Sequence, residues 1–219
     1  MREVYRFLEE LRQNNNREWF NAHKEWYLAV KARHEDFINQ VIPALAVTEP
    51  DMDGLTAKDC IFRIYRDVRF SPNKEPYKTH IGAYMVRGGK KSPRSGYYVH
   101  VEPGNSLLAG GIWCPEPSLL KALRKDVYDN IDEFTGIIRD KEFQKYYVLD
   151  GEKLKTVPAP FPKDFPEGEL LKYKSYTIEN KVPDSFFEGE DAIERIVKRL
   201  LVMQPFHRFL NYTVEETWR

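Results

Sequence analysis

Three arginines and two lysines lie close together between residues 63 and 78, and both residue types bind anions. They are Arg63, Arg66, Arg69, Lys74 and Lys78. Arginine presents a planar fork that matches a phosphate or a carboxylate, and lysine adds a mobile positive charge. We therefore predict that these side chains bind a small ligand that carries a phosphate or carboxylate group.

Three further residues of the same stretch are candidates for catalysis. They are Asp67, Tyr77 and His80. Asp67 would orient an arginine, or act as a base if its pKa were raised. Tyr77 and His80 would shape the ligand site or transfer protons. These residue types do not specify a reaction, and they leave open whether the chain is an enzyme.

The charge distribution supports two other hypotheses. Lysine plus arginine equals aspartate plus glutamate, at 34 each, yet residues 63–94 hold nine basic residues against two acidic ones. This local balance of +7 suggests, as a second choice, a nucleic-acid or protein interaction module that uses the 63–94 patch and its 87–94 loop. A third hypothesis is purely structural, with Arg66, Asp67 and Arg69 as an ion-pair lattice that holds a hairpin.

Metal and cofactor motifs are missing from the sequence. The five histidines include no H-E-x-x-H pattern, the two cysteines form no C-x-x-C, and no P-loop or dinucleotide fingerprint is present. We expect no metal and no cofactor. His100 and Glu102 share one face of a predicted strand and could serve acid–base chemistry, but a solvated sheet face is the favoured interpretation.

The order of helical and strand-like segments predicts an α+β protein with a single domain over residues 1–219. Residues 1–48 have helical periodicity, 60–114 form a small, mainly antiparallel sheet, and 115–219 are helical and irregular with one strand near 173–181. The N-terminal and C-terminal helices pack on the sheet.

Local signals refine the helical part. Asn15 is a predicted N-cap with Glu18 as its capping-box partner. Pro43 should bend or end the helix that precedes it. In the last third, Asp140 is predicted to cap a helix.

Strand alternation sorts the motif residues. If residues 62–70 form a strand, one face points to the core and carries Phe62, Ile64, Val68 and Phe70. Arg66 falls on the same face, so it needs a buried carboxylate partner or a bend in the strand. Further along, alternation places Lys78, His80 and Tyr84 on one face. Two strands joined by the 71–76 loop would bring Arg63, Arg69, Lys78 and His80 together.

Four segments of the chain carry a resemblance to a known family. They read NNNREWF near the N-terminus, FRIYRDVRFS and KEPYKTH in the middle, and GGIWCPEP further on. The chain resembles, over residues 3–212, a family of uncharacterised conserved hypothetical proteins, domain of unknown function 2461, found in bacteria and fungi. The resemblance implies a shared fold and no particular activity. This chain has Asn73 where the pattern leads us to expect an acidic residue.

The N-terminal segment and the two cysteines predict the cellular location of the protein. The segment MREVYRFLEELR is a helix pattern and no signal peptide, and no segment has the roughly 20 apolar residues that span a bilayer. Cys60 and Cys114 are expected to be reduced thiols. We predict a cytoplasmic protein without membrane contact, and the sequence makes no prediction of its oligomeric state.

Overall fold

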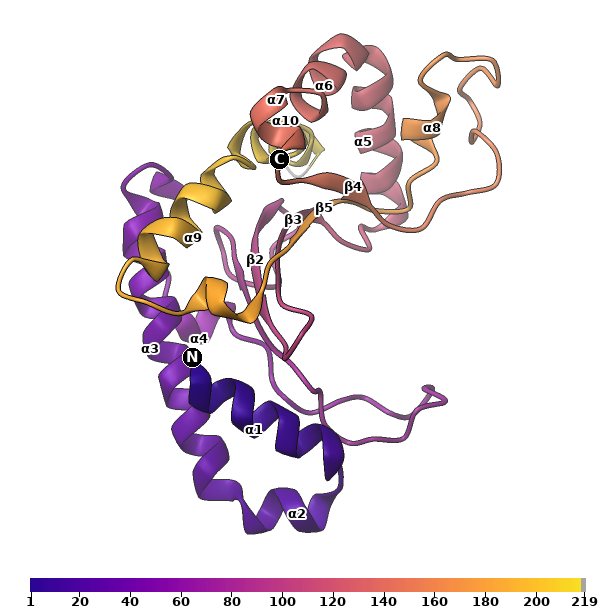
Figure 1. The fold of residues 1–219 in the computed structure, drawn as a ribbon. Helices are drawn as coiled ribbons and strands as arrows, with labels where there is room; N and C mark the ends of the chain where they lie inside the picture. The colour runs from indigo at the N-terminus through magenta and orange to yellow at the C-terminus, as the bar shows by residue number, and fades with distance from the viewer. Residues whose placement is uncertain (218–219) are drawn as a thin grey trace. The chain divides into compact units, whose positions relative to one another are not determined.

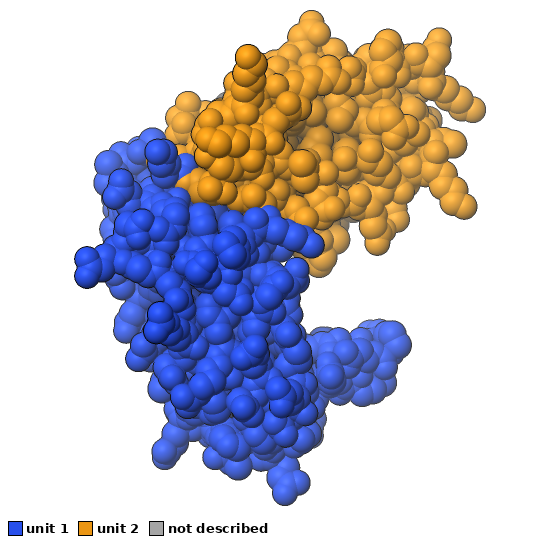
Figure 2. All heavy atoms as spheres, in the orientation of Figure 1, with its two compact units in different colours: residues 1–90, 98–108, 181–198 blue, residues 91–97, 109–180, 199–219 orange. Residues whose placement is uncertain are grey.

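The computed structural model describes residues 1–217. Within them the chain forms ten α-helices, two 3₁₀ helices and five β-strands (Figure 1). It divides into two compact units (Figure 2). Unit 1 comprises residues 1–90, 98–108 and 181–198, and unit 2 comprises residues 91–97, 109–180 and 199 onward.

The strands form one antiparallel sheet in the order β1-β2-β3-β5-β4, which confirms the α+β class. The strands are β1 (Ile81–Met85), β2 (Gly96–Val101), β3 (Leu107–Ile112), β4 (Val148–Asp150) and β5 (Tyr176–Lys181). The first three lie inside the predicted sheet region, and β5 coincides with the strand expected near residues 173–181. The short strand β4, which pairs antiparallel with β5, was not predicted.

Three helices of the N-terminal region occupy the predicted residues 1–48. They are α1 (Arg2–Gln13), α2 (Arg17–Ala22) and α3 (Lys24–Ala46). The 3₁₀ helix η1 (Pro50–Met52) and α4 (Ala57–Cys60) follow them and were not predicted. Helix α1 buries one apolar stripe, and the ring of Phe7 contacts aromatic rings of α2 and α3. The helical spacing of large apolar residues therefore places an aromatic core in unit 1.

Two local details in these helices differ from the prediction. Helix α3 does not end at Pro43 but continues to Ala46, because Val41, Ile42 and Leu45 are buried and their packing outweighs the missing hydrogen bond. The N-cap of α2 is Asn16 rather than its neighbour, since the Asn16 side chain accepts the hydrogen bond from the Trp19 backbone N–H at 2.9 Å.

The remaining helices are mostly in unit 2. They are α5 (Pro117–Asp129), α6 (Ile131–Ile138), α7 (Lys141–Gln144), α8 (Gly168–Leu171), the 3₁₀ helix η2 (Asp184–Phe187) of unit 1, α9 (Ala192–Leu201) and α10 (Gln204–Thr217). The predicted cap is confirmed at Asp140, whose carboxylate accepts from two backbone N–H groups of α7. No helix among the described residues is long and apolar enough to cross a membrane.

The segment 61–80 does not form the expected strand. Its pairing reduces to two isolated bridges, Ile61 with Ala83 and Tyr65 with Tyr77. Ile64 is buried as predicted, but Phe62 is 37% exposed and Phe70 is 94% exposed. A side-chain turn between Asp67 and Arg69 and the two prolines of the following loop interrupt the ladder beyond residue 66.

Candidate functional site

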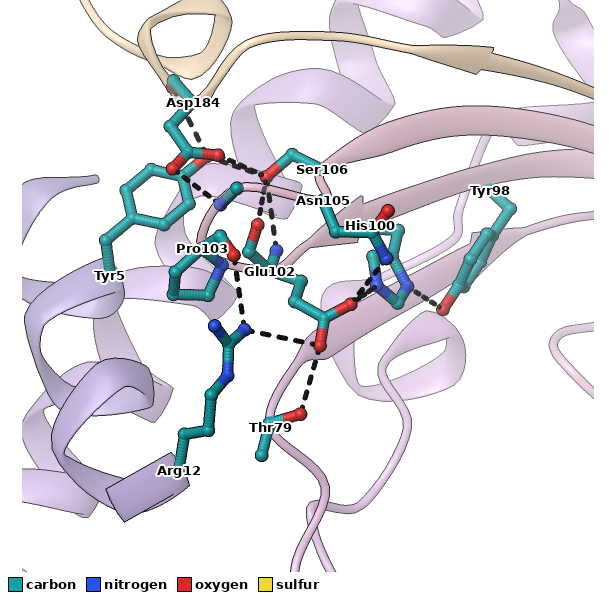
Figure 3. A network of polar contacts seen from close by, with 11 residues as sticks. Tyr5, Arg12, Thr79, Tyr98, His100, Glu102, Pro103, Asn105, Ser106 and Asp184 are labelled. Carbon is teal, nitrogen blue, oxygen red and sulfur yellow. Dashed lines mark hydrogen bonds and ion pairs between the residues drawn. The ribbon is translucent and has the colours of Figure 1, made fainter.

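The polar face of β2 carries the residues of the candidate site. Val99 and Val101 are buried on one face of the strand, whereas Tyr98 and His100 are half-buried on the other. Glu102 follows on the same side as His100, as Figure 3 shows. The predicted alternation is therefore confirmed here, because successive side chains of a strand point to opposite faces.

Hydrogen bonds join three side chains of this face into a chain. The Tyr98 hydroxyl lies 3.0 Å from His100 Nδ1, and His100 Nε2 lies 3.2 Å from Glu102 Oε2. Gly82 of β1 makes room for the tyrosine, since a Cβ at Gly82 would lie 2.4 Å from the Tyr98 hydroxyl oxygen. A glycine on the neighbouring strand thus allows the phenol to approach the imidazole.

Several donors hold the Glu102 carboxylate in place. The Thr79 hydroxyl donates to Oε1 at 3.0 Å, the Asn105 amide donates to Oε2 at 2.8 Å, and the Arg12 guanidinium approaches Oε1 at 3.5 Å (Figure 3). Burial alone would raise the pKa of Glu102, but the hydrogen bonds from Asn105, His100 and Thr79 outweigh it and lower that pKa. Glu102 is therefore an ionised acceptor at neutral pH.

The turn after β2 fixes the backbone that carries Glu102. The Asn105 N–H bonds to the Glu102 carbonyl at 2.9 Å, and Gly104 has a φ of +72°, as the third position of a type II turn requires. The Asp184 carboxylate accepts hydrogen bonds from the Gly104 N–H and from the Ser106 hydroxyl (Figure 3). The carboxylate of Glu102 thus projects from a rigid turn.

His80 adds a second imidazole beside the first. The rings of His80 and His100 have centroids 4.3 Å apart, with an interplanar angle of 30°. Burial, with a smaller contribution from His100, lowers the pKa of His80 to about 4. One nitrogen of each imidazole and one oxygen of Glu102 all lie within 4.8 Å of one another. We call these three residues the His–Glu cluster.

Two motif cations have no acidic partner, and one of them, Lys78, lies near this cluster, because its charge acts on both histidines. Lys78 is half-buried, and its ammonium lies 5.5 Å from the ring centroid of Phe62. Burial and then the charge of Arg63 lower the pKa of Lys78. Among residues 1–217, no carboxylate lies within ion-pair distance of Arg63 or Lys78, which we call the cation pair.

Arg66 is positioned between the cluster and the loop. Its guanidinium lies 3.6 Å from a Glu75 oxygen and 3.4 Å from the Ser71 hydroxyl. Its positive charge also lowers the pKa of His80. The predicted carboxylate partner of Arg66 is therefore Glu75, which lies at the surface rather than inside the core.

The other two predicted anion ligands lie on an exposed loop that projects from unit 1 (Figures 1 and 2). Both nitrogens of one edge of Arg69 donate to Asp67, at 2.9 and 2.6 Å. These bonds lower the pKa of Asp67 to about 2, the opposite of the change that a general base requires. Lys74 donates to the carbonyl of Val68 at 3.0 Å.

Tyr77 lies in the aromatic core rather than at the polar face. It is 4% exposed, and its ring stacks on Phe20 at a centroid distance of 3.9 Å. The side-chain amide of Asn15 bonds to both the N–H and the carbonyl of Tyr77. This pair of bonds explains why Asn15, the predicted cap, is not used to cap α2.

The structure therefore brings together part of the predicted motif and adds residues that the prediction had set aside. His80 lies beside His100 and Glu102, the charge of Lys78 acts on both histidines, that of Arg66 on His80, and that of Arg63 on Lys78. Asp67, Arg69 and Lys74 lie on the loop instead. The signal for the added pair was the spacing of His100 and Glu102 on one strand face. Their proximity to His80 depends on the register of two strands.

A separate cavity of about 650 Å³ lies elsewhere in unit 1. None of the sequence-predicted site residues lines it. Its charged and polar lining mixes both signs: Arg2, Glu3, Arg33, Asp36, Gln40, Glu188 and Glu190.

Comparison with known proteins gives one match. A family model described as conserved hypothetical protein (DUF2461) matches residues 3–209 of the chain. No curated protein and no solved structure matches.

Proposed function

The chain belongs to the DUF2461 family of conserved hypothetical proteins, and we propose that it binds a small ligand bearing a phosphate or carboxylate group beside the His–Glu cluster. One observation carries the proposal. Arg63 and Lys78 hold positive charge near each other, Lys78 is half-buried, and neither has a carboxylate partner in the described part of the chain.

Two neighbouring cations without a counter-charge are unfavourable for folding, and this supports the proposal of a bound anion. Two like charges repel, and burial of an ammonium without a counter-charge opposes folding. Other cations of the motif avoid this cost, because Arg69 is paired with Asp67 and Arg66 with Glu75. A bound anion would supply the missing counter-charge for Arg63 and Lys78.

The remaining motif cations have secondary roles in the proposal. Arg66 lies near enough to His80 to contact the same ligand, with Glu75 as the group that orients it. Lys74, on the exposed loop, raises the local positive potential and so attracts anions toward the cation pair, whereas Asp67 neutralises the charge of Arg69.

The His–Glu cluster would add acid–base chemistry to binding. His100 contacts both the Tyr98 hydroxyl and the Glu102 carboxylate, so a proton on either ring nitrogen has a hydrogen-bonding partner. Because both ring nitrogens of His100 are engaged, a ligand would exchange a proton with it through the Tyr98 hydroxyl or the Glu102 carboxylate. His80, whose imidazole has no hydrogen bond within residues 1–217, has a nitrogen that could accept a proton directly.

The test compares anion binding to matched lysine variants. Inorganic phosphate, pyrophosphate and citrate serve as probes in isothermal titration calorimetry. We expect Lys78→Met to weaken binding of the best probe by about 10- to 100-fold, since a charge-assisted hydrogen bond contributes about 1.5–3 kcal/mol. Lys31→Met is the matched control, because Lys31 is an exposed lysine of α3 that already pairs with Glu35.

Equal binding by Lys78→Met and by Lys31→Met would contradict the proposal. Arg63→Gln provides a second test of the same site, because Arg63 is exposed and its replacement leaves no buried group without a partner.

A nucleic-acid ligand is the second candidate function, and one observation favours it. Phe70 is 94% exposed at the end of the loop and lies beside the Arg69 guanidinium, an arrangement on which a base could stack. Against it, Arg87 pairs with Asp51 and Arg94 with Glu215, so part of the basic patch is neutralised. Steep loss of single-stranded DNA binding between low and physiological salt, abolished by Phe70→Ala, would favour this alternative.

The cysteines support a cytoplasmic location as part of the proposal. Cys60 is buried and Cys114 is exposed, and both are free thiols. Reduced thiols are typical of proteins in a reducing compartment. Localisation of a fluorescently tagged chain tests this assignment.

A further inference from the structure

We propose that His80, His100 and Glu102 form a binding site for one divalent transition-metal ion. The three residues supply two imidazole nitrogens and a carboxylate oxygen within 4.8 Å of one another. This site goes beyond anion binding by the cation pair, and its existence does not depend on that proposal.

The donor set matches known metal chemistry. Two histidines and one carboxylate bind Zn²⁺ in several hydrolytic sites and Fe²⁺ in non-haem oxygenases. Three protein ligands leave coordination positions open for water or for a ligand atom. No sequence motif indicates this site, because His80 and His100 are twenty residues apart and fit no metal-binding pattern.

The spacing of two of the ligand atoms already suits coordination. His100 Nε2 and Glu102 Oε2 are 3.2 Å apart. Two ligand atoms that each lie about 2.1 Å from one ion are roughly 3.0 to 3.4 Å apart in octahedral or tetrahedral geometry. These two atoms could therefore bind an ion without a change in their separation.

The third ligand is free to complete the site. Within residues 1–217, no group hydrogen-bonds to the His80 imidazole, although its ring lies against that of His100. A neutral imidazole always has one nitrogen lone pair that can accept a proton or a metal. Rotation of the His80 ring toward an ion would break no hydrogen bond.

The groups around the ligands would orient them. If His100 binds through Nε2, its Nδ1–H donates to the Tyr98 hydroxyl at 3.0 Å. Thr79 holds the second oxygen of Glu102 at 3.0 Å and so aims the first oxygen at the imidazole. Metal-binding histidines and carboxylates are usually fixed in this way by hydrogen bonds to neighbouring groups.

Positive charges near the site work against it and set its expected strength. Arg12 contacts Glu102 at 3.5 Å, and the charges of Lys78 and Arg66 act on His80. These cations repel a metal ion, so we expect weaker binding than at a closed structural zinc site. The competing interpretation is a hydrogen-bond network that needs no ion.

Metal titration of the full chain tests the site. The exposed thiol is first removed by Cys114→Ser, since thiolates bind Zn²⁺ themselves, and the protein is freed of metal by dialysis against a chelator. Zn²⁺ binding is measured by calorimetry, and Co²⁺ binding by visible absorption, which reports coordination geometry. We expect one ion per chain.

Matched variants locate the ion. We expect His80→Asn and His100→Ala each to weaken Zn²⁺ binding by more than the roughly 10- to 100-fold that follows loss of a hydrogen bond to a ligand. Tyr98→Phe should weaken it by about that smaller factor. His23→Gln is the control, because His23 lies outside the cluster and bonds to the Trp19 carbonyl, and it should bind as the parent does.

The proposal is overturned by either of two results. One is the absence of stoichiometric Zn²⁺ and Co²⁺ binding to the parent chain. The other is a folded His80→Asn chain that binds Zn²⁺ as tightly as the His23→Gln chain. Thermal unfolding of every variant verifies folding, and His80→Asn keeps the test decisive if His100→Ala does not fold, because His80 has no hydrogen bond to lose.

Discussion

Replacement of His34 should stabilise the protein, and more so in acid. His34 lies in α3, is 1% exposed, and neither of its ring nitrogens has a hydrogen-bonding partner among the described residues. A buried polar group without a partner costs about 1–3 kcal/mol. We expect His34→Leu, a change of similar volume, to raise the free energy of unfolding by about that amount at pH 7.5.

The acid dependence follows from the pKa of the same residue. Burial lowers the pKa of His34 from 6.5 to about 4 in the folded state. Between pH 6.5 and 4 the unfolded chain binds a proton at His34 that the folded chain does not, so the free energy of unfolding falls as the pH falls. The complete decrease in the free energy of unfolding is about 3 kcal/mol, and it begins only below about pH 6.5.

Urea unfolding at several pH values measures this effect. The advantage of His34→Leu over the parent should widen by most of that 3 kcal/mol between pH 7.5 and 4.5. Other histidines, including His80 and His207, also titrate in acid but are common to both chains, so the difference isolates His34. His34→Gln is the control, since it keeps a buried polar group without a titration and should remove only the pH dependence. An advantage that is the same at both pH values would refute the reasoning.

Three further changes test the packing and bonding around the site. Gly82→Ala should lower the free energy of unfolding by about 1–3 kcal/mol and shift the His100 imidazole resonances in NMR spectra, because the new methyl group displaces the Tyr98 ring. Unchanged resonances would contradict this. Asn15→Ala should lower the free energy of unfolding, measured with urea, by about 1–3 kcal/mol, because two backbone groups of Tyr77 lose their partner. An unchanged free energy of unfolding would show that Asn15 does not stabilise this segment. Arg69→Ala should leave the unfolding midpoint unchanged, because its ion pair is fully exposed; an unfolded variant would disprove this.

The fold was predictable where one periodicity dominates. The apolar stripe of α1 and the alternation of β2 both appear in the structure at the expected residues, because one face of each element is buried and the other is not. The acidic cap of α7 at Asp140 was equally clear, since a single carboxylate satisfies two N–H groups of the first turn.

Prediction failed where side chains bond over long sequence separations. Asn15 is a good cap by type, yet its amide bonds to the backbone of Tyr77, 62 residues away, and the cap moves to Asn16. The segment after Arg66 has strand-like alternation, yet the Asp67–Arg69 turn and Pro72 make it a loop with Phe70 exposed. The local sequence pattern does not reveal such long-range contacts.

The candidate site was predictable in its residue types and not in its grouping. The five cations and His80 stand out by density, but only the pairing of strands separates Lys78 and His80 at the site from Lys74 and Arg69 on the loop. The position of His80 beside His100 depends on strand register, which a single sequence does not specify across a gap of twenty residues.

A crystal structure grown in phosphate would show whether the cation pair binds an anion. We predict one phosphate within hydrogen-bond distance of both Arg63 and Lys78, on the side of the His–Glu cluster, and loss of that phosphate in Lys78→Met crystals grown under the same conditions. Contradiction would come from phosphate bound only at other cations, with Arg63 and Lys78 turned to solvent or paired with carboxylates.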